Sequence, residues 1–358
     1  MNNINIITIK SIITPNELIK KIKILPDTKH FINIKRTLFC HILNGLNHKL
    51  IVIVGPCSIH NYDNAIKYAH FLKKMIEKYK EHLFIIMRVY FEKPRTTIGW
   101  KGFLYDPKLD GTNDIETGLN LARTLLLELN KMQIPCASEA LDTLTPQYFG
   151  DLITYYAVGA RTVESQLHRQ LVSGLSTPVG FKNSTNGAID VAINAIISSK
   201  SPHSFLGTNI DGQISIVNTS GNKNCNIILR GSNLNTNYSK TDIQNTENKM
   251  LNKKLIPSII VDASHGNSKK NFKNQQIVVN DICKQISDGN VNIHGVMLES
   301  NIHEGKQNIN DKPLKFGVSI TDSCINIQKT DELLQKLFNA VQIRNNSINE
   351  AFLRNLDC

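Results

Sequence analysis

The sequence lacks the features of several protein classes. Its seven cysteines include no C-x-x-C pair and no spacing typical of a small disulfide-bonded domain, so reduced thiols are expected. No stretch approaches the ~18 consecutive apolar residues that a membrane span needs. Residues 1–26 mix lysine and asparagine among isoleucine instead of forming the apolar segment of a signal peptide. We therefore predict a soluble cytoplasmic protein with no membrane partner.

Acidic residues are fewer than basic ones, but this excess does not indicate a nucleic-acid partner. Lys and Arg number 41 against 30 Asp and Glu, giving a formal net charge of +11. The lysines are scattered, for example at Lys20, Lys73 and Lys269. A nucleic-acid surface would need basic clusters interleaved with aromatic residues. We expect no nucleic-acid partner, while anionic substrates are compatible with the charge.

Short apolar runs alternate with longer amphipathic stretches after residue 45, the pattern of repeated βα units around a parallel sheet. The predicted strands are Leu50–Val54, Leu83–Met87, Pro135–Ser138, Ala157–Ala160, Pro178–Phe181, Ser204–Leu206, Ile259–Asp262 and His294–Leu298. The predicted helices are Asn64–Lys78, Gly118–Leu129, Pro146–Tyr155, Asp190–Ser198, Ile277–Ser287 and Asp331–Arg344. Strands and helices in similar number predict an α/β fold, the (β/α)8 TIM barrel. An open doubly wound sheet would need a glycine-rich turn after the first strand, where this chain has Gly55-Pro56-Cys57-Ser58.

Two segments do not fit the repeat. Residues 1–45 precede the first strand, and we interpret them as an N-terminal extension for oligomerisation or regulation. Gln213–Leu229 alternates apolar residues on both sides of a Ser220-Gly221-Asn222 turn, which predicts a β-hairpin inserted at about residues 208–230. We expect neither segment in the barrel core, which leaves residues 46–345 as the catalytic barrel and 346–358 as a C-terminal tail. Surface decoration is the alternative for both attachments.

Charged residues follow nearly every predicted strand, at the end where barrel enzymes place their active sites. These residues are Arg88, Glu139, Arg161, Lys182, His265 and Glu299, with Cys57 beside them and Asp322 after the eighth strand. One such residue alone is more often an ordinary surface charge. Six at equivalent positions indicate a site, because converging charges are costly unless pairing or function offsets them.

The group divides by chemistry into candidate metal ligands and candidate anion-binding residues. The candidate metal ligands are Cys57, His265, Glu299 and Asp322. A soft thiol, a borderline imidazole and two hard carboxylates suit a divalent ion such as Mn²⁺, Fe²⁺, Co²⁺ or Zn²⁺. A buried thiol, a structural histidine and two salt-bridged acids are the alternative. Two cationic clusters predict two phosphate or carboxylate sites, formed by Arg88, Lys93, Arg95, Arg161, Lys182 and Arg230. A solvated basic rim is the alternative here.

Seven motifs together resemble one enzyme family, the type I 3-deoxy-D-arabino-heptulosonate-7-phosphate (DAHP) synthases. They are GPCSIH at 55–60, MR with YFEKPRT at 87–96, GART at 159–162, GFKN at 180–183, LRG at 229–231, SHGN at 264–267 and SITD at 319–322. The resemblance runs from about residue 11 to 343. It implies a transferase that condenses phosphoenolpyruvate with erythrose 4-phosphate and releases phosphate, at the start of the shikimate pathway to aromatic amino acids.

The resemblance also implies roles for individual residues. It assigns one divalent metal ion to Cys57, His265, Glu299 and Asp322, and the phosphoenolpyruvate pocket to Arg88, Lys93, Arg161, Lys182 and Arg230 with Glu139 nearby. Arg95 and Thr96 are assigned to the phosphate of erythrose 4-phosphate. Lys93 is the expected proton donor to the new hydroxyl, and His265 is counted with the catalytic residues. Glu139 or a metal-bound water is expected to activate the attacking water.

Within the family, the segments 264–268 and 299–305 resemble most the tryptophan-sensitive isozyme, which implies feedback by tryptophan. A homodimer or homotetramer is expected. The chain departs from the family pattern at Ser184, Asn186, Gln170 and Ile327-Gln328, which leaves the feedback site in question. Rival enzymes are the octulosonate-phosphate synthase, which uses arabinose 5-phosphate, and a metal-dependent aldolase of other specificity. A nucleic-acid-binding module is the rival from another class.

Overall fold

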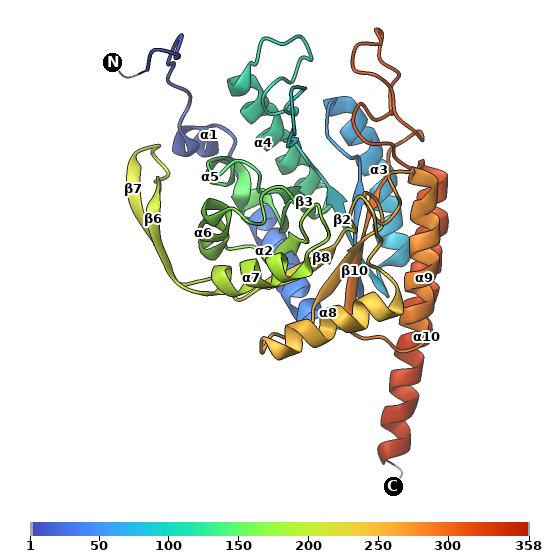
Figure 1. Ribbon diagram of the computed structural model, residues 1–358. Helices are drawn as coiled ribbons and strands as arrows, with labels where there is room; N and C mark the ends of the chain where they lie inside the picture. The colour runs from blue at the N-terminus through green and yellow to red at the C-terminus, as the bar shows by residue number, and fades with distance from the viewer. Residues whose placement is uncertain (1–2, 357–358) are drawn as a thin grey trace.

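The computed structural model describes residues 3–356, which form a closed barrel of parallel strands (Figure 1). The eight barrel strands are β1 (Leu50–Gly55), β2 (Leu83–Arg88), β3 (Cys136–Glu139), β4 (Tyr155–Val158), β5 (Val179–Lys182), β8 (Cys225–Leu229), β9 (Ile259–Asp262) and β10 (Ile293–Glu299). Strand β1 pairs in parallel with both β2 and β10, which closes the cylinder. The predicted (β/α)8 TIM barrel is confirmed.

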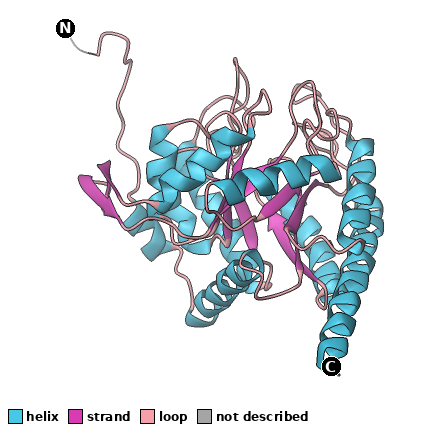
Figure 2. Ribbon diagram, turned by 60° about the horizontal axis from the view of Figure 1, so that its bottom comes forward, coloured by secondary structure: helices cyan, strands magenta, loops and turns pink. Residues whose placement is uncertain are grey.

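Helices surround the strands, as the cyan and magenta ribbons of Figure 2 show. They are α3 (Tyr62–Tyr79), α4 (Ile115–Lys131), α5 (Thr145–Phe149), α6 (Gln166–Gly174), α7 (Ile189–Lys200), α8 (Lys240–Asn252), α9 (Gln275–Ser287) and α10 (Ile327–Leu356), with 3-10 turns η1 (Gly150–Leu152) and η2 (Phe272–Asn274). Side chains of Asn61, Asp114 and Ser239 accept backbone hydrogen bonds at the starts of α3, α4 and α8. Helices α6 and α8 were not predicted, because their sequences carry few apolar residues.

The helix predicted at Pro146–Tyr155 is wrong in its second half. Helix α5 and η1 end at Leu152, and Tyr155 already begins β4. The aromatic and β-branched residues around this position suit a buried strand as well as a helix, so periodicity alone does not separate the two.

Two helices precede the barrel, α1 (Pro15–Lys21) and α2 (Pro26–Leu43). Phe39, Ile42 and Leu43 of α2 join the apolar cluster formed by the inward-facing residues of the strands. The Phe39 ring stacks on Tyr155 at a centroid distance of 4.4 Å. The prediction that residues 1–45 lie outside the core is therefore wrong for α2. A barrel interior filled by apolar side chains needs a cover at the end away from the active site, and α2 supplies it.

The inserted hairpin exists, but its predicted position is wrong. Strands β6 (His203–Thr208) and β7 (Ile214–Thr219) pair with each other in antiparallel fashion, apart from the barrel. Ser204–Leu206 is therefore not a barrel strand, and the sixth barrel strand is β8. Every residue of β8 is buried, as a strand covered on both faces requires, whereas exposure alternates along β6 and β7.

The predicted C-terminal tail at 346–358 is also wrong as far as Leu356, because α10 continues to that residue. No glycine or proline follows Arg344 to end the helix. Residues 357 and 358 of the predicted tail lie outside the described residues. Figure 1 shows the last turns of α10 projecting beyond the body of the molecule. Across residues 3–356, none of the helices combines the length and the apolar character needed to cross a membrane. The cytoplasmic location stays a prediction.

Candidate active site

A thiol and two carboxylates lie together at the carboxyl end of the barrel strands. Gly55 of β1 pairs with Glu299 of β10, so the turn after β1 brings Cys57 to the Glu299 side chain. The Cys57 Sγ atom is 3.9 Å from Asp322 Oδ2. Ligand atoms of Cys57, Glu299 and Asp322 all lie within 4.8 Å of one another. Three of the four predicted metal ligands therefore form one cluster.

The fourth predicted ligand, His265, lies at the edge of this cluster. Its Nε2 atom is 3.7 Å from Glu299 Oε1, and its Nδ1 atom is 2.9 Å from Asp262 Oδ2. The backbone of His265 has φ +54°, in the left-handed region that non-glycine residues seldom adopt. The ring is held by Asp262 on one nitrogen and presents the other toward Glu299.

The cluster has the chemistry of a cation site. Glu299 is 2% exposed, and its Oε1 accepts no hydrogen bond from the residues described. Burial raises the pKa of the Cys57 thiol, and the carboxylates of Glu299 and Asp322 raise it further. A divalent cation among them would bind the Glu299 oxygen that accepts no hydrogen bond and would stabilise the Cys57 thiolate. Sulfur, nitrogen and oxygen donors together fit a first-row divalent ion.

A buried arginine of β2 and a half-buried lysine of the loop that follows it support the cluster. The Arg88 guanidinium lies 3.1 Å from Glu299 Oε1, donates to the Pro56 and Cys57 carbonyls, and stacks over the Tyr90 ring. The Lys93 ammonium is 3.2 Å from Cys57 Sγ. Burial alone would lower the pKa of Lys93, but the Cys57 thiolate and nearby carboxylates raise it. The Arg88 guanidinium is thus already paired with groups of the protein, whereas the Lys93 ammonium lies beside the cluster.

Sequence reasoning missed Asp262, which connects the two halves of the site. Its Oδ2 atom is 2.7 Å from the Lys182 ammonium and 2.9 Å from His265 Nδ1. Burial opposes its ionisation, but His265 and Lys182 hold the pKa of Asp262 well below its usual range. The signal was present, because Asp262 is the last residue of β9 and therefore a strand-end charge.

Three of the predicted anion-binding residues converge beside this network. Lys182 ends β5, Arg230 follows β8, and Arg161 follows β4. Burial lowers the pKa of Arg230; the nearby Arg161 charge lowers it further, and Asp262 opposes both. Among residues 3–356, neither Arg161 nor Arg230 forms an ion pair. Two neighbouring guanidinium groups, neither of which pairs directly with a carboxylate of the described residues, make a site for an anion.

The remaining predicted residues lie around the rim. Glu139 Oε1 is buried without a hydrogen-bond partner among the described residues, against Gly159, where a Cβ would come within 2.3 Å of it. Arg95 and Thr96 are exposed on the loop after β2. The Arg95 Nε atom donates to the Trp100 carbonyl at 2.7 Å. The structure therefore brings every predicted site residue to one mouth of the barrel, with Arg95 and Thr96 outermost.

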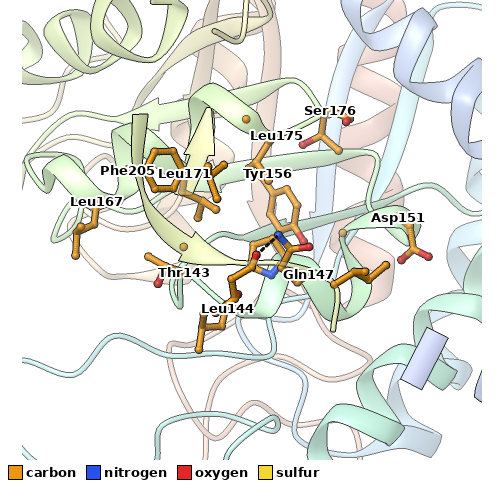
Figure 3. A pocket seen from close by; sticks show the side chains of 18 of the residues that line it. Thr143, Leu144, Gln147, Asp151, Tyr156, Leu167, Leu171, Leu175, Ser176 and Phe205 are labelled. Carbon is orange, nitrogen blue, oxygen red and sulfur yellow. Dashed lines mark hydrogen bonds between the residues drawn. The ribbon is translucent and has the colours of Figure 1, made fainter. Parts of the chain in front are cut away.

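A separate cavity of about 750 Å³ lies outside the barrel. It is bounded by α5, α6 and the β6–β7 hairpin, and Figure 3 shows the side chains of Leu171, Tyr156 and Phe205 turned toward the same space. The Tyr156 and Thr177 hydroxyls are buried there without a hydrogen-bond partner among the residues described. This apolar cavity with a few polar groups has the character of a small-molecule site.

The sequence model of the DAHP synthetase I family matches residues 19–335. The chain is 45% identical over 340 residues to the Tyr-sensitive phospho-2-dehydro-3-deoxyheptonate aldolase of Escherichia coli (strain K12), covering 94% of this chain and 95% of that protein. It is 46% identical over 345 residues to the Phe-sensitive enzyme of the same organism, covering 96% and 98%. The solved structure of phospho-2-dehydro-3-deoxyheptonate aldolase from Francisella tularensis SCHU S4 matches with a TM-score of 0.93 at 47% identity, covering 95% and 99%.

Proposed function

The chain belongs to the DAHP synthetase I family, and we propose that it is the transferase that condenses phosphoenolpyruvate with erythrose 4-phosphate into DAHP and phosphate. The observation that carries this proposal is the cluster of Cys57, Glu299 and Asp322 beside unpaired guanidinium groups in one barrel mouth. Both substrates are phosphorylated, and both kinds of site are required for their condensation. The reaction would open the route to the aromatic amino acids.

We propose that Cys57, His265, Glu299 and Asp322 hold one divalent ion, which is Mn²⁺, Fe²⁺, Co²⁺ or Zn²⁺. When bound, such an ion polarises the aldehyde oxygen as a Lewis acid. Asp262 contributes by accepting the hydrogen bond of His265 Nδ1, which fixes the ring so that Nε2 faces the cluster.

Phosphoenolpyruvate is proposed to bind Arg161, Lys182 and Arg230 through its phosphate and carboxylate. The two guanidinium groups offer forked donors that match such oxyanions, and they offset charge that develops as phosphate leaves. Arg88 is proposed to support this pocket indirectly, because its guanidinium pairs with Glu299 and donates to the Cys57 carbonyl in the turn after β1. Arg88, Lys182 and Arg230 are buried, so a low-dielectric setting strengthens their attraction for the substrate, whereas Arg161 is exposed at the opening.

Proton transfers are assigned to Lys93 and Glu139. The Lys93 ammonium borders the cluster, and its raised pKa keeps it protonated as a donor to the hydroxyl formed from the aldehyde. The unpartnered Oε1 of Glu139 is available to accept a proton from the water that attacks C2. Arg95 and Thr96, exposed on the loop after β2, are proposed to clamp the phosphate of erythrose 4-phosphate.

A steady-state assay tests this function. Purified protein with Mn²⁺, phosphoenolpyruvate and erythrose 4-phosphate should consume the enolpyruvate absorbance and release one phosphate for each DAHP formed. Arabinose 5-phosphate serves as the rival substrate, and polynucleotide retention at low salt tests the rival nucleic-acid class. Faster turnover of arabinose 5-phosphate would replace the proposal with the octulosonate-phosphate synthase.

We further propose that the cavity behind α5 and α6 binds an aromatic amino acid that inhibits the enzyme. Its apolar walls suit an aromatic side chain, and relatives carry the names Tyr-sensitive and Phe-sensitive. The tryptophan preference inferred from the sequence is retained as a prediction. One hydrogen bond connects the cavity wall with the barrel mouth: Thr145, which stands between the lining residues Leu144 and Pro146, donates to Glu92 Oε2 at 3.1 Å, next to Lys93.

Inhibition assays with tyrosine, phenylalanine and tryptophan test this site. Phe205→Ala removes an aromatic wall of the cavity and should weaken inhibition and direct binding while kcat stays unchanged. Leu251→Ala, on the exposed side of α8, is the control and should change neither. If Phe205→Ala is inhibited as strongly as the wild type, the inhibitor does not bind in this cavity.

The oligomer is proposed to form through the hairpin and the N-terminal segment. Apolar side chains stand exposed on both, at Leu206, Ile214 and Ile216 and at Ile7 and Ile9. Figure 1 shows the hairpin standing away from the barrel. Exposed apolar groups of this kind mark subunit contacts. Replacing Ile214 and Ile216 together by Asp should yield monomers in sedimentation analysis, and an unchanged assembly would exclude this surface.

A further inference from the structure

Three buried asparagines join the ends of three neighbouring barrel strands. Asn183 follows Lys182 at the end of β5, Asn237 lies in the loop after β8, and Asn267 lies in the loop after β9. Their exposed fractions are 0%, 7% and 3%. Three carboxamides inside a protein, at the point where the barrel ladder stops, need a physical reason for being there.

The first two carboxamides tie β5 to the loop after β8. Asn183 Oδ1 accepts the Arg230 backbone N–H at 2.9 Å and Asn237 Nδ2 at 3.0 Å. Asn183 Nδ2 donates to the Gly231 carbonyl at 3.0 Å. Asn237 Oδ1 accepts the Gly231 N–H at 2.7 Å. Arg230 and Gly231 are therefore held through their own backbone groups.

The third carboxamide extends the connection to β9. Asn267 Oδ1 accepts the Asn237 backbone N–H at 2.8 Å. Asn267 Nδ2 donates to the Leu229 and Asp262 carbonyls, each at 3.0 Å. A Cβ on Gly231 would lie 2.6 Å from the Asn267 nitrogen, so the two loops touch backbone to backbone. No larger side chain fits between them.

The side-chain amide suits the region just beyond the ends of the barrel strands. Beyond the strand ends, backbone N–H and C=O groups lose their ladder partners, and buried groups without partners are costly. An asparagine supplies both a donor and an acceptor, whereas an aspartate of the same shape supplies acceptors alone. The side-chain atoms of Asn183, Asn237 and Asn267 all have partners, so the connection is complete.

We propose that Asn183, Asn237 and Asn267 are positioning residues that set the spacing of Lys182, Arg230 and His265. Lys182 precedes Asn183, Arg230 is held by its backbone N–H, and His265 lies two residues before Asn267. The inference rests on the proposed binding of phosphoenolpyruvate by Lys182 and Arg230. It adds residues that touch neither substrate nor metal but fix the groups that do.

The network predicts a selective effect on one substrate. Its bonds reach β5, β8 and β9, whereas Arg95 and Thr96 stand on the loop after β2. A shift of about 1 Å in catalytic groups costs on the order of 100-fold. Loosening the network should therefore impair phosphoenolpyruvate binding and leave the affinity for erythrose 4-phosphate unchanged.

The experiment replaces Asn237 by Asp, which keeps the shape and removes the donor to Asn183. Phosphoenolpyruvate binding is measured by fluorescence of Trp100, the single tryptophan, with Mn²⁺ present and no second substrate. Binding should weaken about 10- to 100-fold, with KM for phosphoenolpyruvate rising in parallel and KM for erythrose 4-phosphate constant. Asn237→Ser retains a neutral donor and acceptor, so it should bind phosphoenolpyruvate more tightly than Asn237→Asp and less tightly than the wild type. It also replaces the Asp variant in the test if that variant does not fold.

The matched control is Asn130→Asp. Asn130 is 1% exposed on α4, and its Nδ2 donates to the Leu126 and Leu152 carbonyls away from the site. This variant should lose stability with phosphoenolpyruvate binding intact. Equal affinity for phosphoenolpyruvate in wild type, Asn237→Asp and Asn130→Asp would overturn the inference. Wild-type protein that binds phosphoenolpyruvate yet forms no DAHP would refute the proposed reaction alone, and wild-type protein that binds none would overturn both.

Discussion

Replacing Asp262 by Asn removes one charge from a buried ion pair and keeps the shape of the side chain. The partner ammonium of Lys182 lies 2.7 Å away, and the two side chains are 6% and 1% exposed. Removing one member of such a pair costs about 3–5 kcal/mol, because the other charge stays buried without its partner. The same change loosens the hold on His265, and losing the group that orients a metal-ligating histidine weakens metal affinity about 10- to 100-fold.

Two measurements separate these effects. Urea unfolding of metal-free protein reports the ion-pair loss, and Mn²⁺ titration against a competing chelator reports the metal affinity. The control is Asp151→Asn, which breaks the pair with the fully buried Arg123 away from the mouth. It should lower stability and leave metal affinity unchanged. Wild-type metal affinity in Asp262→Asn would refute the assignment of Asp262 as the group that orients His265.

Three further predictions follow from buried or unpaired side chains. Burial and the neighbouring acids raise the pKa of Glu92 to about 8. The folded state therefore keeps the Glu92 proton that the unfolded state loses, and the free energy of unfolding falls as the pH rises from about 5 to 7. Glu92→Gln should remove a slope of about 1.4 kcal/mol per pH unit, and equal slopes in urea unfolding would contradict this. Arg161→Ala should lower kcat/KM for phosphoenolpyruvate by orders of magnitude, and an unchanged value would reject its role. Phe39→Ala should lower the free energy of unfolding by about 3–5 kcal/mol, and a loss under about 1 kcal/mol would argue against α2 as a cover of the core.

The site was largely predictable because it depends on strand ends. A barrel brings the carboxyl ends of its strands to one mouth, so charges found just after apolar runs converge whatever the loops do. Cys57 and Glu299 meet for this reason, although 242 residues separate them, from 299 − 57. The sequence pattern does not single out Asp262, because His265, three residues later, is the more conspicuous polar residue after the same strand.

The predicted and observed elements differ where one local sequence pattern fits two kinds of element. His203–Thr208 and Cys225–Leu229 are both short and contain isoleucine, leucine or phenylalanine, and only burial on both faces separates them. The sequence does not predict that α2 packs against the core, because no local pattern shows which apolar helix covers a barrel end. Asn237 carried no signal at all, because its role comes from contacts with residues far away in the sequence.

The central claim is that one divalent ion held by Cys57, His265, Glu299 and Asp322 is required for the condensation. Titrating Mn²⁺ into chelator-treated, desalted protein while measuring DAHP formation tests it most directly. The account predicts activity that rises linearly and levels off at one ion per chain, and no activity for Cys57→Ala at that same ratio. Full activity in the metal-free protein, or an unchanged titration for Cys57→Ala, would contradict it.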